Sequence, residues 1–273
     1  MFDIVIATCS ECGRRAANED ALRVGESGAT RYAVLADGAG GHARGAEAAR
    51  RVVDHVEAAL QSAASAEVSE FAGEHLTRAL LTAHVALQRE QLGTQGRRRM
   101  HTTVVAVWID TRRDRAVWSH VGDSRLYRLR YGAVDLVTAD DSVVQRMLES
   151  GALTAQQAEH HPLKNQLLAA IGMQDGLEPH TLAAPAPLDD GDVFLLCTDG
   201  WWGALTEAQI VGTLTDADTA QGWLDAMRTL IAARAAPGQD NFSAIAVWVT
   251  DPAESTHPLA DLEETVAAPL RSG

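Results

Sequence analysis

The stretch YAVLADGAGGH, residues 32–42, places Asp37 at the end of an apolar run and directly before a glycine-rich turn. An apolar run of this length that is bounded by glycine is typical of a buried strand. Three further aspartates, Asp123, Asp199 and Asp240, stand at one end of a similar run. Their stretches are AVWSHVGDSR (116–125), DVFLLCTDG (192–200) and PGQDNFSAIAVWV (237–249).

One aspartate at a strand tip is ordinary turn chemistry. Four on separate strands predict that several strand tips meet at one site. Carboxylates that converge repel one another and raise each other's pKa unless a cation neutralises them. Oxygen ligands of this kind suit hard ions such as Mg²⁺ and Mn²⁺. The pattern therefore predicts a metal centre with several carboxylate ligands.

Composition limits the classes of partner. The chain has 273 residues, 46% of them hydrophobic and 22% charged, which are values of an ordinary globular protein. Its net charge of −14 argues against binding to nucleic acid or to an anionic membrane surface, because both need a basic face. The N-terminus MFDIVIATCSE lacks a basic start and a long apolar stretch. We therefore expect a cytoplasmic protein. A monomer is a separate expectation.

The three cysteines, Cys9, Cys12 and Cys197, are too few for a disulfide framework. Cys9 and Cys12 form a C-x-x-C pair, which invites a zinc or redox interpretation. A zinc site usually needs a second pair, and a redox pair normally opens a helix, whereas this one lies between a strand and a loop. We expect reduced, free thiols.

Hydrophobic periodicity predicts the order of the elements. The expected strands are 2–9, 32–37, 102–110, 115–123, 124–132, 134–138, 178–184, 192–199 and 242–249. The expected long helices are 43–64, 68–92, 206–214 and 217–235. Short turns join the four strands between 102 and 138, which indicates an antiparallel meander.

Mostly antiparallel strands with grouped helices predict an α+β fold. We expect a central antiparallel β-sandwich whose two sheets are each covered outside by a helix pair, in the order α-β-β-α. One domain should span 1–251, and the tail 252–273, which has no periodicity, should be disordered.

Residues 140–173 have a different texture. Two short helical patterns are interrupted by Ser150-Gly151 and by His161-Pro162, and proline restricts the residue before it. We expect a loosely packed flap close to the site, because the segment follows the GDSR turn.

Seven segments, in order along the chain, resemble motifs of the metal-dependent protein phosphatases of the PPM family, the type 2C serine/threonine phosphatases, in their bacterial form. They are GRRAANED (13–20), ADGAGGHARGAEAA (36–49), MHTTVV (100–105), HVGDSRLYRLR (120–130), the flap sequence, LLCTDGWW (195–202) and GQDNFSAI (238–245). Two positions depart from the family pattern: His101 replaces a glycine, and Asp141 replaces a histidine that many bacterial members have. These departures concern flap position and substrate preference.

The resemblance implies two Mn²⁺ or Mg²⁺ ions that share a water, with a third ion as an option. The implied metal ligands are Glu19, Asp20, Asp37, the Gly38 carbonyl, Asp123, Asp199 and Asp240. In this assignment Asp37 bridges the two ions, Gly38 serves one of them, and Asp199 with Asp240 holds the other. Asp123 and Asp199 would form the third site.

The resemblance also implies hydrolysis of phosphoserine and phosphothreonine in proteins by a metal-activated water. Arg15 would bind the phosphate, and His42 would donate a proton to the leaving alkoxide. A separately encoded serine/threonine kinase is the expected counterpart, and the TDGWW sequence resembles phosphatases associated with type VI secretion.

Other interpretations stay open at this point. Arg15 as a surface ion pair, His42 as a structural histidine and Asp123 as a cap are the alternatives for these residues. Trp201 and Trp202 either pack or form a substrate wall. For the whole protein, the alternatives are a non-catalytic regulatory module of the same fold and a phosphoesterase for small molecules.

Overall fold

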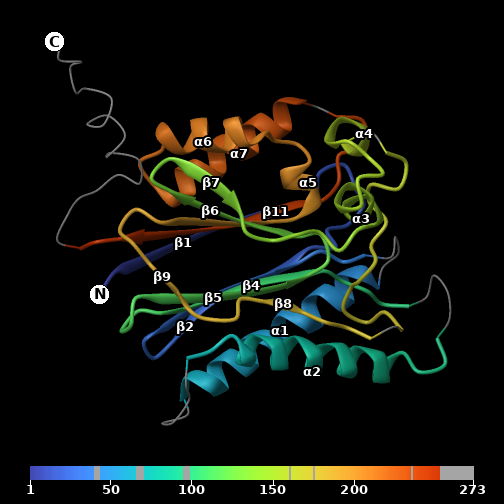
Figure 1. Ribbon diagram of the computed structural model, residues 1–273, viewed down its shortest axis with the longest axis horizontal. Helices are drawn as coiled ribbons and strands as arrows, with labels where there is room; N and C mark the ends of the chain where they lie inside the picture. Colours follow the sequence, from blue (N-terminus) through green and yellow to red (C-terminus); the bar gives the residue numbers. More distant parts are fainter. Residues whose placement is uncertain are drawn as a thin grey trace.

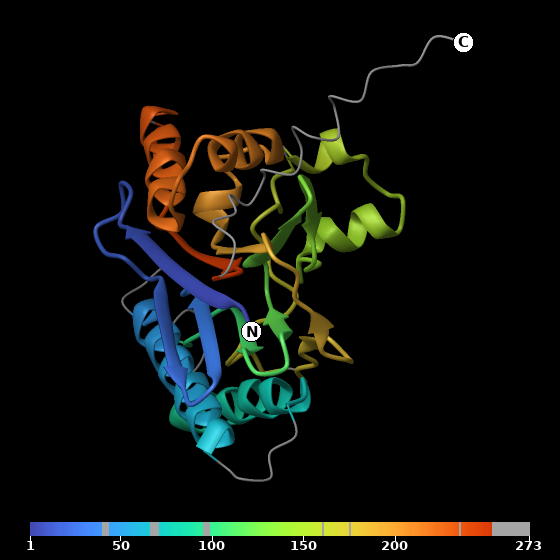
Figure 2. The ribbon, with the colours of Figure 1, turned by 90° about the vertical axis from the view of Figure 1, so that its left-hand side faces the viewer.

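The computed structural model describes residues 1–39, 44–65, 71–94, 99–159, 161–174, 176–234 and 236–252. Two sheets lie face to face, and a pair of helices covers the outer face of each (Figure 1). Figure 2 shows the two helix pairs on opposite sides of the sandwich. The expected α+β sandwich is confirmed.

Among the described residues, one sheet has five strands and the other has six, and the pairs within both are antiparallel. The first sheet has the order β1 (Asp3–Glu11), β11 (Phe242–Thr250), β10 (Val193–Cys197), β6 (Arg125–Arg130) and β7 (Ala133–Leu136). The second has the order β2 (Ala21–Ser27), β3 (Thr30–Ala36), β4 (Val104–Asp110), β5 (Arg115–Val121) and β8 (His180–Thr181), and β9 (Ala186–Pro187) also pairs with β5.

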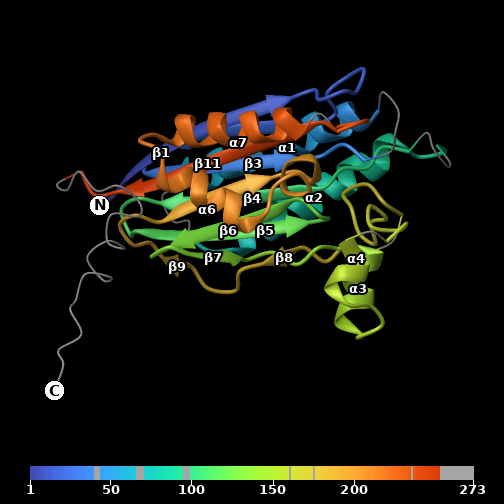
Figure 3. The same ribbon diagram turned by 90° about the horizontal axis from the view of Figure 1, so that it is seen from above.

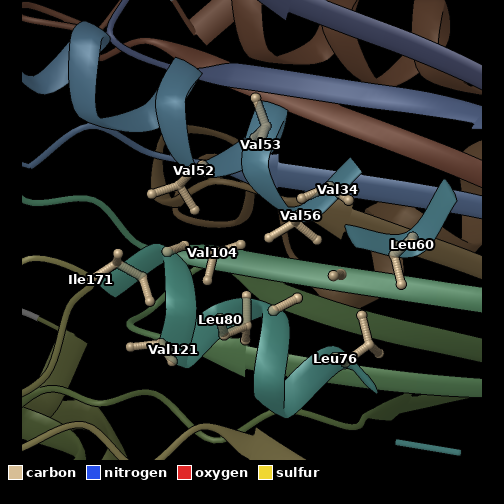
Figure 4. Close-up of a cluster of buried hydrophobic side chains, with 14 of the residues drawn as sticks. Val34, Val52, Val53, Val56, Leu60, Leu76, Leu80, Val104, Val121 and Ile171 are labelled. Carbon is tan, nitrogen blue, oxygen red and sulfur yellow. The ribbon is translucent and has the colours of Figure 1, made fainter. Parts of the chain in front are cut away.

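The helices fill the outer layers. The second sheet is covered by α1 (Gly45–Ser65) and α2 (Glu74–Glu90), and the first by α6 (Glu207–Thr215) and α7 (Ala220–Arg234) (Figure 1). Buried apolar side chains form three clusters, one between the sheets and one under each helix pair. Figure 4 shows the cluster in which Val52 and Val56 of α1 and Leu80 of α2 lie against the second sheet.

Both faces of the central strands are buried, which explains their continuous apolar runs. In β3, Val34 belongs to the cluster under α1 and α2, whereas Leu35 belongs to the cluster between the sheets. Successive residues of a strand point to opposite faces, so a strand covered on both sides needs apolar residues at every position.

The predicted meander is wrong in one respect. The strands β4 and β5 belong to one sheet, whereas β6 and β7 belong to the other. The chain crosses between the sheets at Gly122, which has a φ of 99° and where a Cβ atom would lie 2.6 Å from the Thr103 side chain. This crossing places Asp123 between the ends of the two sheets.

Two other element predictions need correction. The strand β2 was not predicted, because it is an edge strand whose residues are mostly half-buried and whose sequence ALRVGES has no strong apolar pattern. The strand expected at 178–184 is reduced to the two residues of β8, with β9 following separately.

The flap forms two short helices, α3 (Val143–Glu149) and α4 (Ala155–Glu159), which project from one end of the sandwich (Figure 3). The segments on either side of these helices meet, because Val143 N–H donates to Gln166 O at 2.9 Å. In the described part of the chain, none of the helices has the length and apolar character needed to cross a membrane. The tail predicted to be disordered falls, from residue 253 onward, outside the described residues.

Candidate functional site

A cavity of about 480 Å³ brings together residues that are far apart in the sequence. Six of the seven predicted ligands line it, together with Arg15: Glu19, Asp37, Gly38, Asp123, Asp199 and Asp240. Asn165 and Leu167 of the flap segment also line it. The flap therefore borders the site directly, and both sheets contribute to the cavity.

Asp37 follows the last residue of β3 and is fixed by the two residues that directly precede β4. Its backbone N–H donates to Thr103 Oγ1 at 3.0 Å, and its carbonyl accepts from Thr103 N–H at 2.9 Å and from Thr102 Oγ1 at 2.8 Å. Thr103 Oγ1 also lies 2.7 Å from Ser124 Oγ. The Thr-Thr pair thus holds the backbone of Asp37 and leaves its carboxylate to the cavity.

Gly38 lies so close to another backbone segment that no side chain fits. A Cβ atom there would overlap the backbone of Gly45, the first residue of α1, and would lie 2.7 Å from Glu19 O. The tight approach of Glu19, Gly38 and Gly45 explains the glycines at both positions.

Asp199 and Asp240 come from neighbouring strands of the first sheet. Asp199 begins the short helix α5 (Asp199–Trp202) two residues after β10 ends, and Asp240 lies two residues before β11. Arg15 reaches Asp240, with its NH2 atom 2.7 Å from Asp240 Oδ2. The Arg15 side chain is 56% exposed, so the guanidinium stands at the mouth of the cavity.

Asn241 has a structural role that was not predicted from the sequence. It is buried; its Nδ2 donates to Cys12 O at 2.9 Å and Ala17 O at 3.0 Å, and its Oδ1 accepts from Glu19 N–H at 2.9 Å. The side chain thereby fixes the loop that carries Arg15 and Glu19. Its position next to Asp240 in the sequence GQDN is the feature that could have identified it.

Asp20, the seventh predicted ligand, is not among the residues that line the cavity and lies directly before β2. Its Oδ2 accepts from Thr198 Oγ1 at 3.2 Å, whereas its Oδ1 is buried and has no hydrogen-bond partner. A buried carboxylate oxygen without a partner is costly, and it is a position that a cation or a water would satisfy.

Asp123 lies at the crossing between β5 and β6 and is 6% exposed. Burial, with the charges of Asp199 and Asp140, raises its pKa to about 8. Asp123 is therefore a buried carboxylate that experiences the charge of Asp199.

Electrostatic repulsion runs through the whole carboxylate set. Burial and the charges of Asp199, Asp20, Asp123 and Asp240 raise the pKa of Asp37 well above its usual value. Burial raises the pKa of Asp20 to about 7, against hydrogen bonds from Ser243 and Thr198. Burial and the Asp240 charge raise the pKa of Asp199. Such clustered, desolvated carboxylates are characteristic of functional sites.

Within the described part of the chain, no three carboxylate, imidazole or thiol side chains already close around one point. The carboxylates instead surround the cavity. This spacing suits hard cations that keep several waters and take one or two carboxylates each. His42 lies outside the described residues, so its position relative to the cavity is a prediction still.

The remaining candidates have structural surroundings. His120 is buried and its Nε2 lies 2.8 Å from Ala139 O, as expected for a core histidine. Trp201 is fully buried against Phe242. The three cysteines are free thiols, and burial raises the pKa of Cys9 to about 11.

Comparison with known proteins identifies a family that matches this chain. The family model for protein phosphatase 2C matches residues 10–246. The serine/threonine protein phosphatase PstP of Mycobacterium tuberculosis is 30% identical over 243 residues, which are 87% of this chain and 43% of PstP. The chain thus spans less than half the length of that relative.

Two solved structures share both the fold and sequence similarity. The catalytic domain of PstP in complex with two manganese ions superposes with a TM-score of 0.75 at 26% identity, over 92% of this chain and 100% of that one. PppA, a key regulatory component of T6SS in Pseudomonas aeruginosa, superposes with a TM-score of 0.71 at 26% identity, over 90% and 97% of the two chains.

Proposed function

The chain belongs to the protein phosphatase 2C family, and from this premise we propose that its cavity hydrolyses phosphoserine and phosphothreonine in proteins with the help of divalent cations. The observation that carries the proposal is the ring of five carboxylates around one cavity, with the Arg15 guanidinium at its mouth. The names of its relatives support the substrate class.

The residues present fit divalent cations. The carboxylates repel one another, Asp20 Oδ1 is buried without a partner, and all the donors are oxygen atoms. We propose that Asp37, the Gly38 carbonyl, Asp199 and Asp240 would hold two such ions.

The remaining carboxylates complete this assignment. Glu19 and Asp20 serve the ions directly or through water, and Asp123 with Asp199 takes a third. Mn²⁺ and Mg²⁺ both suit this ligand set.

Bound cations of this kind supply a nucleophilic water near neutral pH and stabilise charge on the phosphoryl group. The chain itself supplies position and charge. Thr103 fixes Asp37, Asn241 fixes the loop of Glu19 and Arg15, and the planar guanidinium of Arg15 matches two phosphate oxygens. His42 is the proposed donor of a proton to the leaving alkoxide.

The cavity also suits a phosphorylated side chain on a protein. Arg15, Ala16 and Ala17 are exposed at its edge, and the flap residues Asn165 and Leu167 form another part of the wall. A phosphorylated residue can enter while the rest of the substrate stays outside. Four expectations stay predictions. They are a serine/threonine kinase as the opposing enzyme, a role beside a T6SS like that of PppA, a cytoplasmic location and a monomeric state.

The test compares substrates. We expect Mn²⁺-dependent release of phosphate from a phosphothreonine peptide, with a kcat/KM at least roughly tenfold above that for sugar phosphates, since recognition of flanking peptide contributes binding energy. Preference for sugar phosphates would indicate a small-molecule phosphoesterase. Absence of hydrolysis of the peptide and of an aryl phosphate by Mn²⁺-loaded, folded protein would indicate a regulatory module.

A further inference from the structure

Trp202 connects two elements that carry site carboxylates. It is the last residue of α5, whose first residue is Asp199. Its indole Nε1–H donates to the backbone carbonyl of Asp123 at 2.9 Å. One side chain thus ties the helix that presents Asp199 to the crossing that presents Asp123.

Arg125 stacks over the indole ring of Trp202. Its guanidinium carbon lies 3.6 Å from the centre of the Trp202 ring, the geometry of a cation–π contact. The same guanidinium binds both oxygens of Asp140, through Nε at 3.0 Å and NH2 at 2.9 Å. Because Asp140 begins the flap, the flap base, Trp202 and the crossing form one connected unit.

The two adjacent tryptophans have different surroundings. Trp201 is fully buried against Phe242, and its Nε1 has no hydrogen-bond partner. Trp202 is half-buried and does not line the cavity, and its indole N–H donates to the backbone carbonyl of Asp123. Trp202 therefore makes a hydrogen bond to the Asp123 backbone in addition to its packing against the apolar cluster under α6 and α7.

We propose that Trp202 is a positioning residue that sets the separation between Asp123 and Asp199. The inference rests on the proposed metal role of these two aspartates. Without the indole donor, the Asp123 carbonyl loses its partner and the buried crossing is free to shift. The ion that the two aspartates share is then held less tightly, because residues that orient ligands affect metal affinity.

The test is Mn²⁺ binding, measured by electron paramagnetic resonance on the full chain. Trp202→Phe keeps a ring for Arg125 and removes only the N–H donor. We expect it to weaken the weakest class of Mn²⁺ site at least roughly tenfold and to leave the tighter ions unchanged. The KM for phosphopeptide and the kcat at saturating Mn²⁺ should return to wild-type values, which a general folding defect would not allow.

The matched control is Trp223→Phe. Trp223 is buried, and its Nε1 donates to Ile210 O and Thr213 Oγ1, away from the cavity. This variant should bind Mn²⁺ as the wild type does. Circular dichroism checks the folding of each variant.

If Trp202→Phe does not fold, Mn²⁺ binding by Arg125→Lys tests the inference instead. Lysine keeps the positive charge but lacks the planar guanidinium that stacks on Trp202 and binds Asp140. Mn²⁺ affinity within twofold of wild type in the folded variant, or an equal loss in Trp223→Phe, overturns the inference. Metal binding is measured without substrate, so a wild-type protein that binds Mn²⁺ but hydrolyses no phosphopeptide would contradict the proposed function and leave this inference standing.

Discussion

At the scale of single residues, Arg15 gives a direct test of phosphate recognition. Its guanidinium lies 2.7 Å from Asp240 at the cavity mouth. Arg15→Ala should raise the KM for a phosphothreonine peptide and lower kcat/KM by roughly 10- to 100-fold, the range expected for lost charge-assisted hydrogen bonds. Steady-state kinetics at saturating Mn²⁺ measures this change.

The neighbouring Arg14 is the matched control, because its side chain does not line the cavity. Arg14→Ala should leave both KM and the Mn²⁺ requirement near wild type. An unchanged KM in Arg15→Ala would contradict the assignment. A rise in the Mn²⁺ concentration needed for half-maximal rate would show that Arg15 serves metal binding instead.

The positions of the site aspartates could be predicted from sequence because strand tips are local features. Asp37, Asp199 and Asp240 each stand beside an apolar run and a small residue, and the structure brings all three to one cavity. The contacts of Asn241 and Trp202 could not be predicted. They join segments that are 222 and 79 positions apart, respectively, and no local pattern encodes such distances.

At the scale of elements, the sequence predicted strands with long apolar runs and missed one edge strand. In β4 every residue is buried, so its pattern is clear, whereas β2 is mostly half-buried and carries charge and glycine. The meander failed for another reason. A short turn predicts that two strands are adjacent, but the left-handed Gly122 sends the chain to the other sheet.

The flap gives the test at this scale. Val143 N–H donates to Gln166 O, so residues 144–165 can be replaced by a short Gly-Ser turn that leaves both ends in place. Asp140 and Asp141, which bind Arg125 and Gly122, are retained. The shortened protein should hydrolyse a small aryl phosphate at nearly the wild-type rate and lose at least about tenfold in kcat/KM on a phosphoprotein, because remote binding is lost.

Equal losses on both substrates in a folded variant would place the flap within the catalytic centre. The control for folding is Mn²⁺ binding, which should be unchanged because residues 144–165 include none of the proposed metal ligands. Asn165 lines the cavity and is removed with the segment, so restoring it by Gly-Ser replacement of 144–164 alone separates its contribution from that of the helices.

At the scale of the whole molecule, the sandwich explains why the site forms where it does. Asp37 follows a strand of one sheet, Asp199 and Asp240 flank strands of the other, and Asp123 lies on the crossing between them. The two sheets are covered on both faces, so their strands are buried and the charged carboxylates lie at the strand ends. The α+β class followed from the order of the elements, whereas the assignment of strands to sheets needed the structure.

The central claim is that these carboxylates hold the cations that drive phosphate hydrolysis. The most direct measurement is Mn²⁺-dependent phosphate release from a phosphothreonine peptide by Asp37→Asn and Asp199→Asn. Asp135→Asn is the control, since Asp135 is exposed on β7 and pairs with Arg128. We predict that both site variants fold and retain less than about a tenth of the wild-type rate, and that the control keeps full activity. A folded site variant that keeps more than this fraction would contradict the account.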